Sequence, residues 1–181
     1  MGPHLAGRED RRTYPTGVQV IVAGVGNVLR GDDGFGVEVA RTLLDGPAPP
    51  GVRVLELGIG GIHLVQELMG AVDGLVVVDA VDLGRDPGTV LVIRPVVRDV
   101  TAMSQQERHD ELADMHYATP ERAFLLARGL GVLPEATWLV GCQPKETDHL
   151  GEGLSPELRA AIGPAAAEVR RVVTSMGLAW N

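Results

Sequence analysis

The apolar residues of this chain follow two patterns that alternate along its length. Residues 18–25 are almost continuously apolar and rich in β-branched side chains, which is typical of a strand buried on both faces of a parallel sheet. Phe35, Val39 and Leu43 follow at intervals of four, which places them on one face of a helix. The pattern predicts a central strand, a glycine-rich turn and a helix that packs on the strand.

Strands and helices continue to alternate after this first unit. Short apolar stretches bounded by turn residues predict four more strands, at residues 52–57, 75–78, 89–93 and 137–140. Helical patterns cover residues 64–69, 120–127 and 155–172. This order predicts a three-layer α/β/α single domain with a mixed, mostly parallel five-stranded sheet.

Two local features add detail to this prediction. The link from Asp79 to Thr89 is shorter than the dozen residues that a parallel crossover needs, so the third and fourth strands are expected to pair antiparallel. Asp32 or Asp33 is expected to be the N-cap of the first helix, because an aspartate side chain can accept from its free N–H groups. The acidic pair is thus placed at the start of that helix.

The length of 181 residues indicates one domain, since a domain has about 150 residues on average. Residues 1–17 contain a charged cluster and no apolar segment of signal-peptide type, so they are expected to be a poorly ordered leader to a domain at 18–181. Residues 94–119 are polar and irregular. Such a long excursion within a compact domain is usually functional or mobile.

Composition excludes several classes of function. The net charge is −8 and aromatic residues make up 3% of the chain, which disfavours nucleic acid as a partner. No apolar run approaches the ~18 residues that span a bilayer, so we expect no membrane insertion. A single cysteine, Cys142, excludes an intrachain disulfide framework and favours a cytoplasmic location.

Acidic side chains follow two predicted strands at the sheet edge where open α/β proteins bind ligands. Asp33 comes after the first strand and Asp79 ends the third, while His116 or His109 from the polar excursion could fold over the crevice. Two carboxylates and an imidazole suit a divalent ion such as nickel or zinc and leave positions open for a substrate. A structural interpretation stays open, with Asp33 as a cap, Asp79 in a turn and His116 on the surface.

A dinucleotide site has weaker support. Gly24 and Gly26 lie between a strand and a helix, but Leu29 stands where the third glycine of the fingerprint belongs. The acid of the second strand is Glu56, whereas a ribose-binding acid is expected about 20 residues after the glycines. The glycines are equally expected in a tight turn.

A cysteine hydrolase also has weaker support. Cys142 follows the fifth strand, with Asp148 and His149 nearby in sequence. A cysteine at the end of a strand is more often a packed residue than a nucleophile.

The turn after the first strand carries a long motif. Residues 24–36 read GVGNVLRGDDGFG, which closely resembles the opening motif of the hydrogenase maturation proteases. These endopeptidases remove a C-terminal extension from the large subunit of [NiFe] hydrogenases. The resemblance continues through residues 76–80, 87–89 and 139–141 with Pro144, and it extends over residues 18–173.

The resemblance implies a site and a substrate. In that family an acid of the opening motif, the aspartate ending the third strand and a histidine before the next helix contact the metal. By position these are Asp33, Asp79 and His116, which also become the expected catalytic residues; His109 does not open the helix in this way. The implied substrate is the large-subunit precursor, cut after nickel insertion, with nickel supplied by the substrate rather than held permanently.

Residues beside these ligands are expected to bind the substrate: Asn27, Asp32, Gly58, Gly60 and Gly61. Glycine backbone can approach a substrate closely because it has no Cβ. In the resembled family this glycine-rich loop helps to choose the precursor, and the threonine common there is absent from this sequence.

The mechanism and one alternative role stay open on the sequence alone. Either the metal or a carboxylate that activates water could drive hydrolysis. A non-enzymatic nickel-sensing chaperone would bind the large subunit without shortening it. His116 must be neutral to bind a metal, so activity should weaken below about pH 6.

Overall fold

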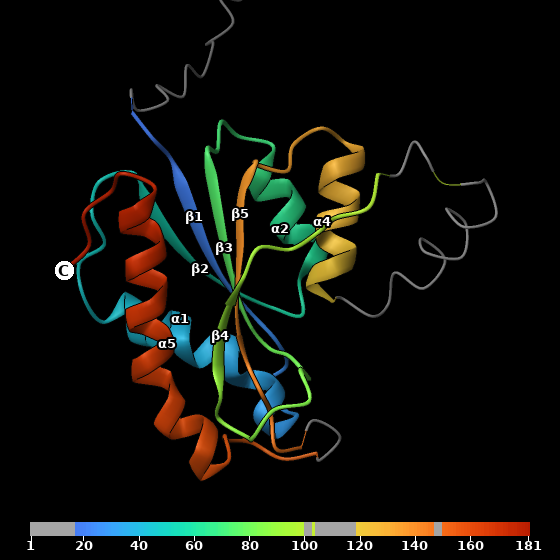
Figure 1. Ribbon diagram of the computed structural model, residues 1–181, viewed down its shortest axis with the longest axis vertical. Helices are drawn as coiled ribbons and strands as arrows, with labels where there is room; N and C mark the ends of the chain where they lie inside the picture. Colours follow the sequence, from blue (N-terminus) through green and yellow to red (C-terminus); the bar gives the residue numbers. More distant parts are fainter. Residues whose placement is uncertain (1–16, 100–102, 104–118, 147–149) are drawn as a thin grey trace, which may run out of the picture.

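The computed structural model describes residues 17–99, 103, 119–146 and 150–181. Its elements are β1 (Val20–Val25), the 3-10 helix η1 (Gly31–Gly34), α1 (Phe35–Leu44), β2 (Val52–Gly58), α2 (Gly61–Leu68), β3 (Gly74–Ala80), β4 (Val90–Ile93), α4 (Pro120–Gly129), β5 (Ala136–Cys142) and α5 (Pro156–Ser175). Helices α1 and α5 cover one face of the sheet, and α2 and α4 cover the other (Figure 1). The predicted three-layer α/β/α fold with a five-stranded mixed sheet is confirmed.

The strand order is β2-β1-β3-β5-β4. Strands β2, β1, β3 and β5 run parallel, and β4 is antiparallel to β5. The predicted pairing of the third strand with the fourth is therefore wrong, because β5 lies between them. Strands in a sheet are about 4.8 Å apart, so the link of residues 81–89 is long enough to carry the chain past one strand position.

Helix α1 lies unusually close to the sheet because glycines face each other across the contact. A Cβ built on Gly24 would lie 2.2 Å from the Gly36 carbonyl oxygen. One built on Gly36 would lie 2.1 Å from the Val78 carbonyl oxygen. Gly24, the first of the two glycines that partly match a dinucleotide fingerprint, thus serves the packing of helix on strand, which is one of the roles that fingerprint glycines have.

The start of α1 differs from the prediction. Gly34 is the N-cap and makes no side-chain cap bond, while Asp32 and Asp33 lie one turn earlier, in η1. The expected capping by Asp32 or Asp33 is therefore wrong, and both carboxylates are available to other partners. The predicted cap of the last helix is confirmed, because Ser155 Oγ accepts from the N–H of Leu158 at 3.4 Å.

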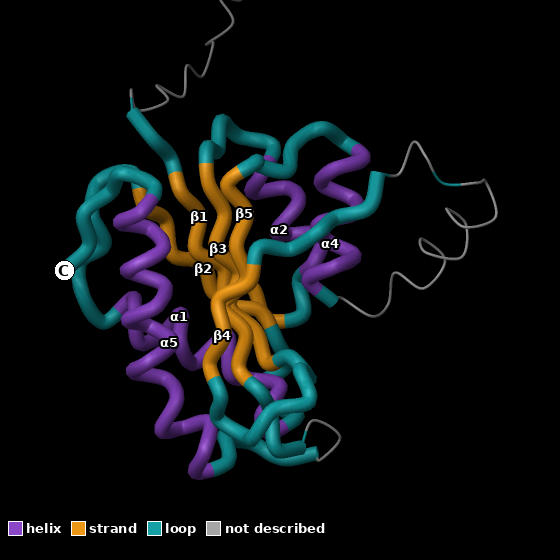
Figure 2. Tube along the Cα trace, viewed as in Figure 1, coloured by secondary structure: helices purple, strands orange, loops and turns teal. Residues whose placement is uncertain are grey.

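Loops that follow β1, β3 and β5 gather at one edge of the sheet, the lower edge in Figure 2. They are tied together there by backbone bonds: the N–H of Gly31 donates to Gly151 at 2.8 Å, and the N–H of Val81 donates to Cys142 at 2.9 Å. Across the described residues, no helix has the length and apolar character needed to cross a membrane. The carboxyl edge of the sheet is thus the place to look for chemistry.

Replacing Gly36 with alanine should destabilise the protein by about 2 kcal/mol or more, because the added methyl would collide with backbone that cannot rotate away. Gly46→Ala is the matched control: Gly46 lies just after the end of α1 and has open space around it, so a change within about 0.5 kcal/mol is expected. Urea denaturation followed by circular dichroism measures both. Equal midpoints for the two variants would contradict the proposed close contact.

Candidate active site

Asp33 and Asp79 come together at the carboxyl edge of the sheet. Asp79 is the penultimate residue of β3 and pairs in register with Gly141 of β5, while Asp33 is held in η1. Gly26 lies between the two: a Cβ at this position would lie 1.8 Å from the Asp33 carbonyl oxygen and 3.7 Å from Asp79 Oδ1. Its φ of +126° also disfavours any other residue. The β1–α1 turn can therefore approach β3 only with glycine at position 26.

Burial and repulsion both raise the pKa of Asp79 well above its usual range. The largest cause is desolvation of the buried carboxyl group, the next is the negative charge of Asp33, and Glu121 adds a smaller repulsion. The N–H of Ala80 donates to Asp79 Oδ1 at 2.9 Å and opposes the shift. No lysine or arginine in the described part of the chain forms an ion pair with Asp33 or Asp79. Their carboxylates thus suit the coordination of a cation.

Asn27 orients Asp33. The backbone N–H of Asn27 donates to Asp33 Oδ2 at 3.0 Å, while Asn27 Oδ1 accepts from the N–H of Leu29 at 3.0 Å. The side chain of Asn27 therefore shapes the turn whose backbone holds the Asp33 carboxylate. A contact of Asn27 with substrate stays a prediction.

Asp32 has a different set of partners from its neighbour. Its side chain is buried and accepts from the N–H of Ser155 at 2.7 Å, from the N–H of Lys145 at 2.9 Å and from Ser155 Oγ at 3.0 Å. These bonds join η1 to the loop between β5 and α5. The sequence suggested substrate binding for Asp32, which stays a prediction. Asp32 therefore acts as a latch, by which we mean the hydrogen bonds that join these two loops. Sequence reasoning missed this role because the donors of these bonds lie more than 110 positions from Asp32 in the chain.

The glycine-rich loop after β2 lies against the same turn. The carbonyl of Gly58 accepts from the N–H of Gly26 at 3.0 Å. The N–H groups of Gly60 and Gly61 already donate to Leu57 and Ile59, at 3.0 and 3.1 Å. Close approach of a substrate to Gly58, Gly60 and Gly61 stays a prediction.

The predicted histidine ligand, His116, and its alternative His109 lie outside the described residues, as do Asp148 and His149. Among the described residues, no group of three or more His, Cys, Asp or Glu side chains is placed to hold a metal ion. Helix α4 begins at Pro120. Glu121, in its first turn, acts electrostatically on Asp79, so this turn lies near the acid pair. Nothing in the sequence except the position of Glu121 at the start of a helix indicated that it would lie near the acid pair.

The sulfur chemistry considered for Cys142 conflicts with the structure. Cys142 is fully buried at the end of β5. Burial, with the nearby charge of Asp32, raises the pKa of its thiol to about 11. A reactive cysteine needs a lowered pKa and some exposure, so Cys142 is a packing residue.

Asp79→Asn should raise the melting temperature at pH 7, because asparagine removes a carboxylate that is costly to ionise in the fold. The folded pKa of Asp79 lies above the unfolded one, so ionisation costs stability as pH rises through the folded pKa. The gain should shrink toward pH 4, near the unfolded pKa of about 3.9. Calorimetry across pH measures it, and Asp45→Asn, at an exposed position, is the control. A gain independent of pH would contradict the ionisation of Asp79 as its cause.

Asp32→Ala should destabilise the protein by about 3 kcal/mol, because several partly buried hydrogen bonds to one charged acceptor are lost together. Ser155→Ala removes one of these bonds and the α5 cap, so it should cost only about 1–2 kcal/mol. Urea denaturation of both variants provides the comparison. Equal losses would rule out Asp32 as the centre of the latch.

Comparison with known proteins shows the family to which the chain is similar. The family model of the hydrogenase maturation proteases matches residues 37–172. The hydrogenase expression/formation protein HupD of Rhodobacter capsulatus is 34% identical over 161 residues, 88% of this chain and 73% of that protein. HupM of Azotobacter chroococcum mcd 1, described in the same words, is 36% identical over 149 residues, 82% of this chain and 68% of that protein.

A solved structure supports the same relationship. The hydrogenase maturating endopeptidase HybD from E. coli matches with a TM-score of 0.70 and 25% identity, covering 90% of this chain and 96% of that one. Sequence and fold thus agree over nearly the whole described domain, and the chain belongs to the hydrogenase maturation protease family of endopeptidases.

Proposed function

We propose that this protein removes the C-terminal extension of a [NiFe] hydrogenase large-subunit precursor after nickel has been inserted, and that it recognises the nickel held by that substrate. Family membership supports the peptidase role in hydrogenase maturation. One observation supports the metal-dependent part of this proposal. The buried Asp79 lies close to Asp33, and neither carboxylate forms an ion pair with a lysine or arginine among the described residues.

The acid pair makes recognition depend on a cation. Two carboxylates held together repel each other, and a divalent ion between them removes both this repulsion and the desolvation penalty of Asp79. Oxygen ligands from Asp33 and Asp79, with a nitrogen from His116, form a set that suits nickel. A precursor without nickel would leave the repulsion in place, so it would bind weakly.

A proton and the metal compete for Asp79. The raised pKa means that the free enzyme holds a proton on Asp79 up to a higher pH than an ordinary aspartate does. Binding of the substrate's nickel must displace this proton, as metal binding does at any protonated ligand. Recognition should therefore strengthen as pH rises through the pKa of Asp79.

Docking through the metal places the peptide bond for hydrolysis. Fixing a reactant in the correct geometry can contribute several kcal/mol to a rate acceleration. The hydrogen bond from the N–H of Asn27 fixes the carboxylate of Asp33, and that from the N–H of Ala80 fixes the carboxylate of Asp79. The two carboxylates would therefore bind the metal of the substrate in one orientation. Nickel supplies Lewis-acid chemistry when it is present.

Mass spectrometry of the precursor tests this function. Nickel-loaded precursor incubated with the wild-type protein should lose the mass of its C-terminal extension, whereas nickel-free precursor should keep its mass. Asp33→Asn, Asp79→Asn and His116→Ala should each lower the cleavage rate about 100-fold or more, because each removes a ligand. Asp45→Asn is the control with an exposed acid outside the site and should cleave normally.

Each alternative result has a distinct meaning. Binding of the precursor without any loss of mass would replace the protease by a nickel-sensing chaperone. Equal cleavage of nickel-free precursor would refute recognition of the metal while leaving the peptidase role in place.

A further inference from the structure

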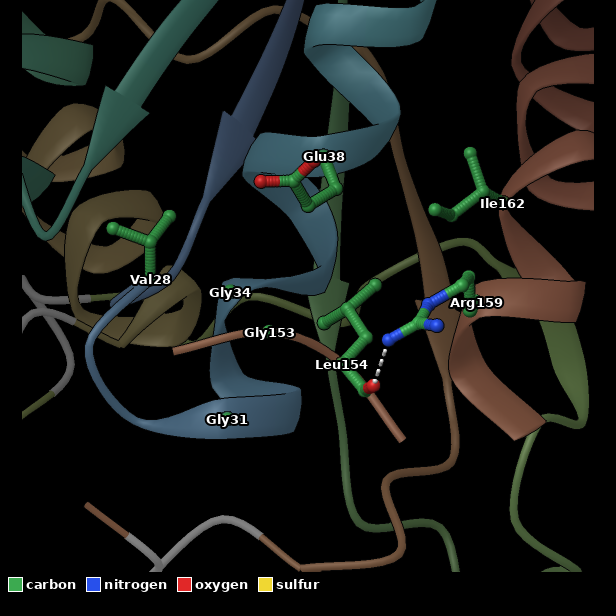
Figure 3. Close-up of a pocket in the computed structure, with 8 residues that line it drawn as sticks. All are labelled: Val28, Gly31, Gly34, Glu38, Gly153, Leu154, Arg159 and Ile162. Carbon is green, nitrogen blue, oxygen red and sulfur yellow. Dashed lines mark hydrogen bonds between the residues drawn. The ribbon is translucent and has the colours of Figure 1, made fainter. Parts of the chain in front are cut away.

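A pocket of about 280 Å³ lies beside η1, the short helix that contains Asp33, and Figure 3 shows the residues that line it. Three apolar side chains and three glycines form most of its wall: Val28, Leu154, Ile162, Gly31, Gly34 and Gly153. This volume is just below the range of pockets that hold drug-sized ligands. The pocket is therefore of a size to take one or two side chains of a peptide.

The pocket and the acid pair share η1 as a common wall. Gly31 and Gly34, the first and last residues of η1, line the pocket. The carboxylate of Asp33 is bonded to the N–H of Asn27 and acts electrostatically on Asp79. The two sites therefore adjoin the same short helix.

The pocket carries a cation that has no charged partner among the described residues. Arg159 donates from Nη2 to the carbonyl of Leu154 at 3.1 Å, and it forms no ion pair with any described residue. Glu38, the acid in the described lining, instead binds Arg41 at 2.7 Å. Figure 3 shows its carboxylate directed away from Arg159. The charge of Arg159 therefore suits a carboxylate brought by a ligand.

Two exposed leucines lie on chain segments that also contribute residues to the pocket wall. Leu29 is 56% exposed and Leu150 is 80% exposed. The chain segments that carry them are joined, because the N–H of Gly151 donates to the carbonyl of Leu29 at 3.1 Å and Arg30 forms a parallel bridge with Gly151. Large apolar side chains held exposed beside a pocket are typical of a surface that binds another protein.

We propose that this pocket is a substrate subsite, which holds an apolar side chain of the precursor while Arg159 binds a carboxylate next to it. This inference rests on the proposed function, since it takes the precursor as the ligand. The acid pair recognises the metal, and the pocket beside η1 recognises the peptide.

Two substitutions test the subsite. Arg159→Met keeps the aliphatic stem and removes the charge, and Ile162→Trp fills the pocket. Each should weaken binding of the nickel-loaded precursor about tenfold, measured as Kd by biolayer interferometry. Each should raise KM for cleavage similarly and change kcat less than twofold, because a subsite away from the reacting bond acts on binding. Arg159→Glu should have a larger effect, since attraction becomes repulsion.

Matched controls separate the subsite from general damage. Arg128→Met removes an exposed arginine from the last turn of α4, and Ala160→Trp places the same tryptophan side chain at an exposed position of α5 outside the pocket lining. Both should bind the precursor as the wild type does. A lysine that replaces the matching carboxylate of the precursor should restore binding to Arg159→Glu.

The outcomes distinguish this inference from the proposed function. Unchanged Kd in both Arg159→Met and Ile162→Trp would overturn the subsite, whether or not the precursor is cleaved. Weakened binding in these variants, with no cleavage even by the wild type, would support the subsite and refute the protease. A precursor that does not bind the wild type would overturn both.

Discussion

The close approach of the β1–α1 turn to the end of β3 is the constraint on which the site depends. It brings the backbone around Asp33 against Gly26, and Gly26 against the carboxylate of Asp79. A side chain at Gly26 would push these elements apart, and the two carboxylates would then be separate surface acids. With glycine the two acids lie close together, and the charge of Asp33 makes the buried carboxyl group of Asp79 harder to ionise. A cation partner is the chemical complement of that arrangement.

Neighbouring aspartates have opposite environments in this turn. Asp32 is surrounded by donors from the β5–α5 loop, so its buried charge is satisfied and fixes the turn. Asp33, the next residue, accepts one described bond and faces another acid. The hydrogen bonds of Asp32 thus help to fix the position of Asp33, the next residue in the chain. This division lets two acids that repel each other lie close together in a turn that other hydrogen bonds hold in place.

The same short helix, η1, contributes to both of the proposed contact sites for the substrate. Asp33 of η1 acts electrostatically on Asp79 of β3, and Gly31 and Gly34 of η1 border the pocket beside Arg159. A substrate that offers a metal to the first and an apolar, acidic segment to the second would be held across the turn. Such two-point contact fixes the orientation of the peptide between the points, which a metal contact alone does not do.

The sequence by itself determined the order of the elements, the buried strands, the cap at Ser155 and the acids at the ends of β1 and β3. These follow from local periodicity and from the rule that ligands collect at the carboxyl ends of parallel strands. The motif at residues 24–36 also carried the family, because its glycines and acids are contiguous. Tertiary structure alone decided that β5 separates β3 from β4, that Asp32 is a latch, and that Arg159 borders a pocket. Each of these features depends on contacts between segments that lie far apart in the chain. A local sequence pattern does not indicate which distant segments will pack together.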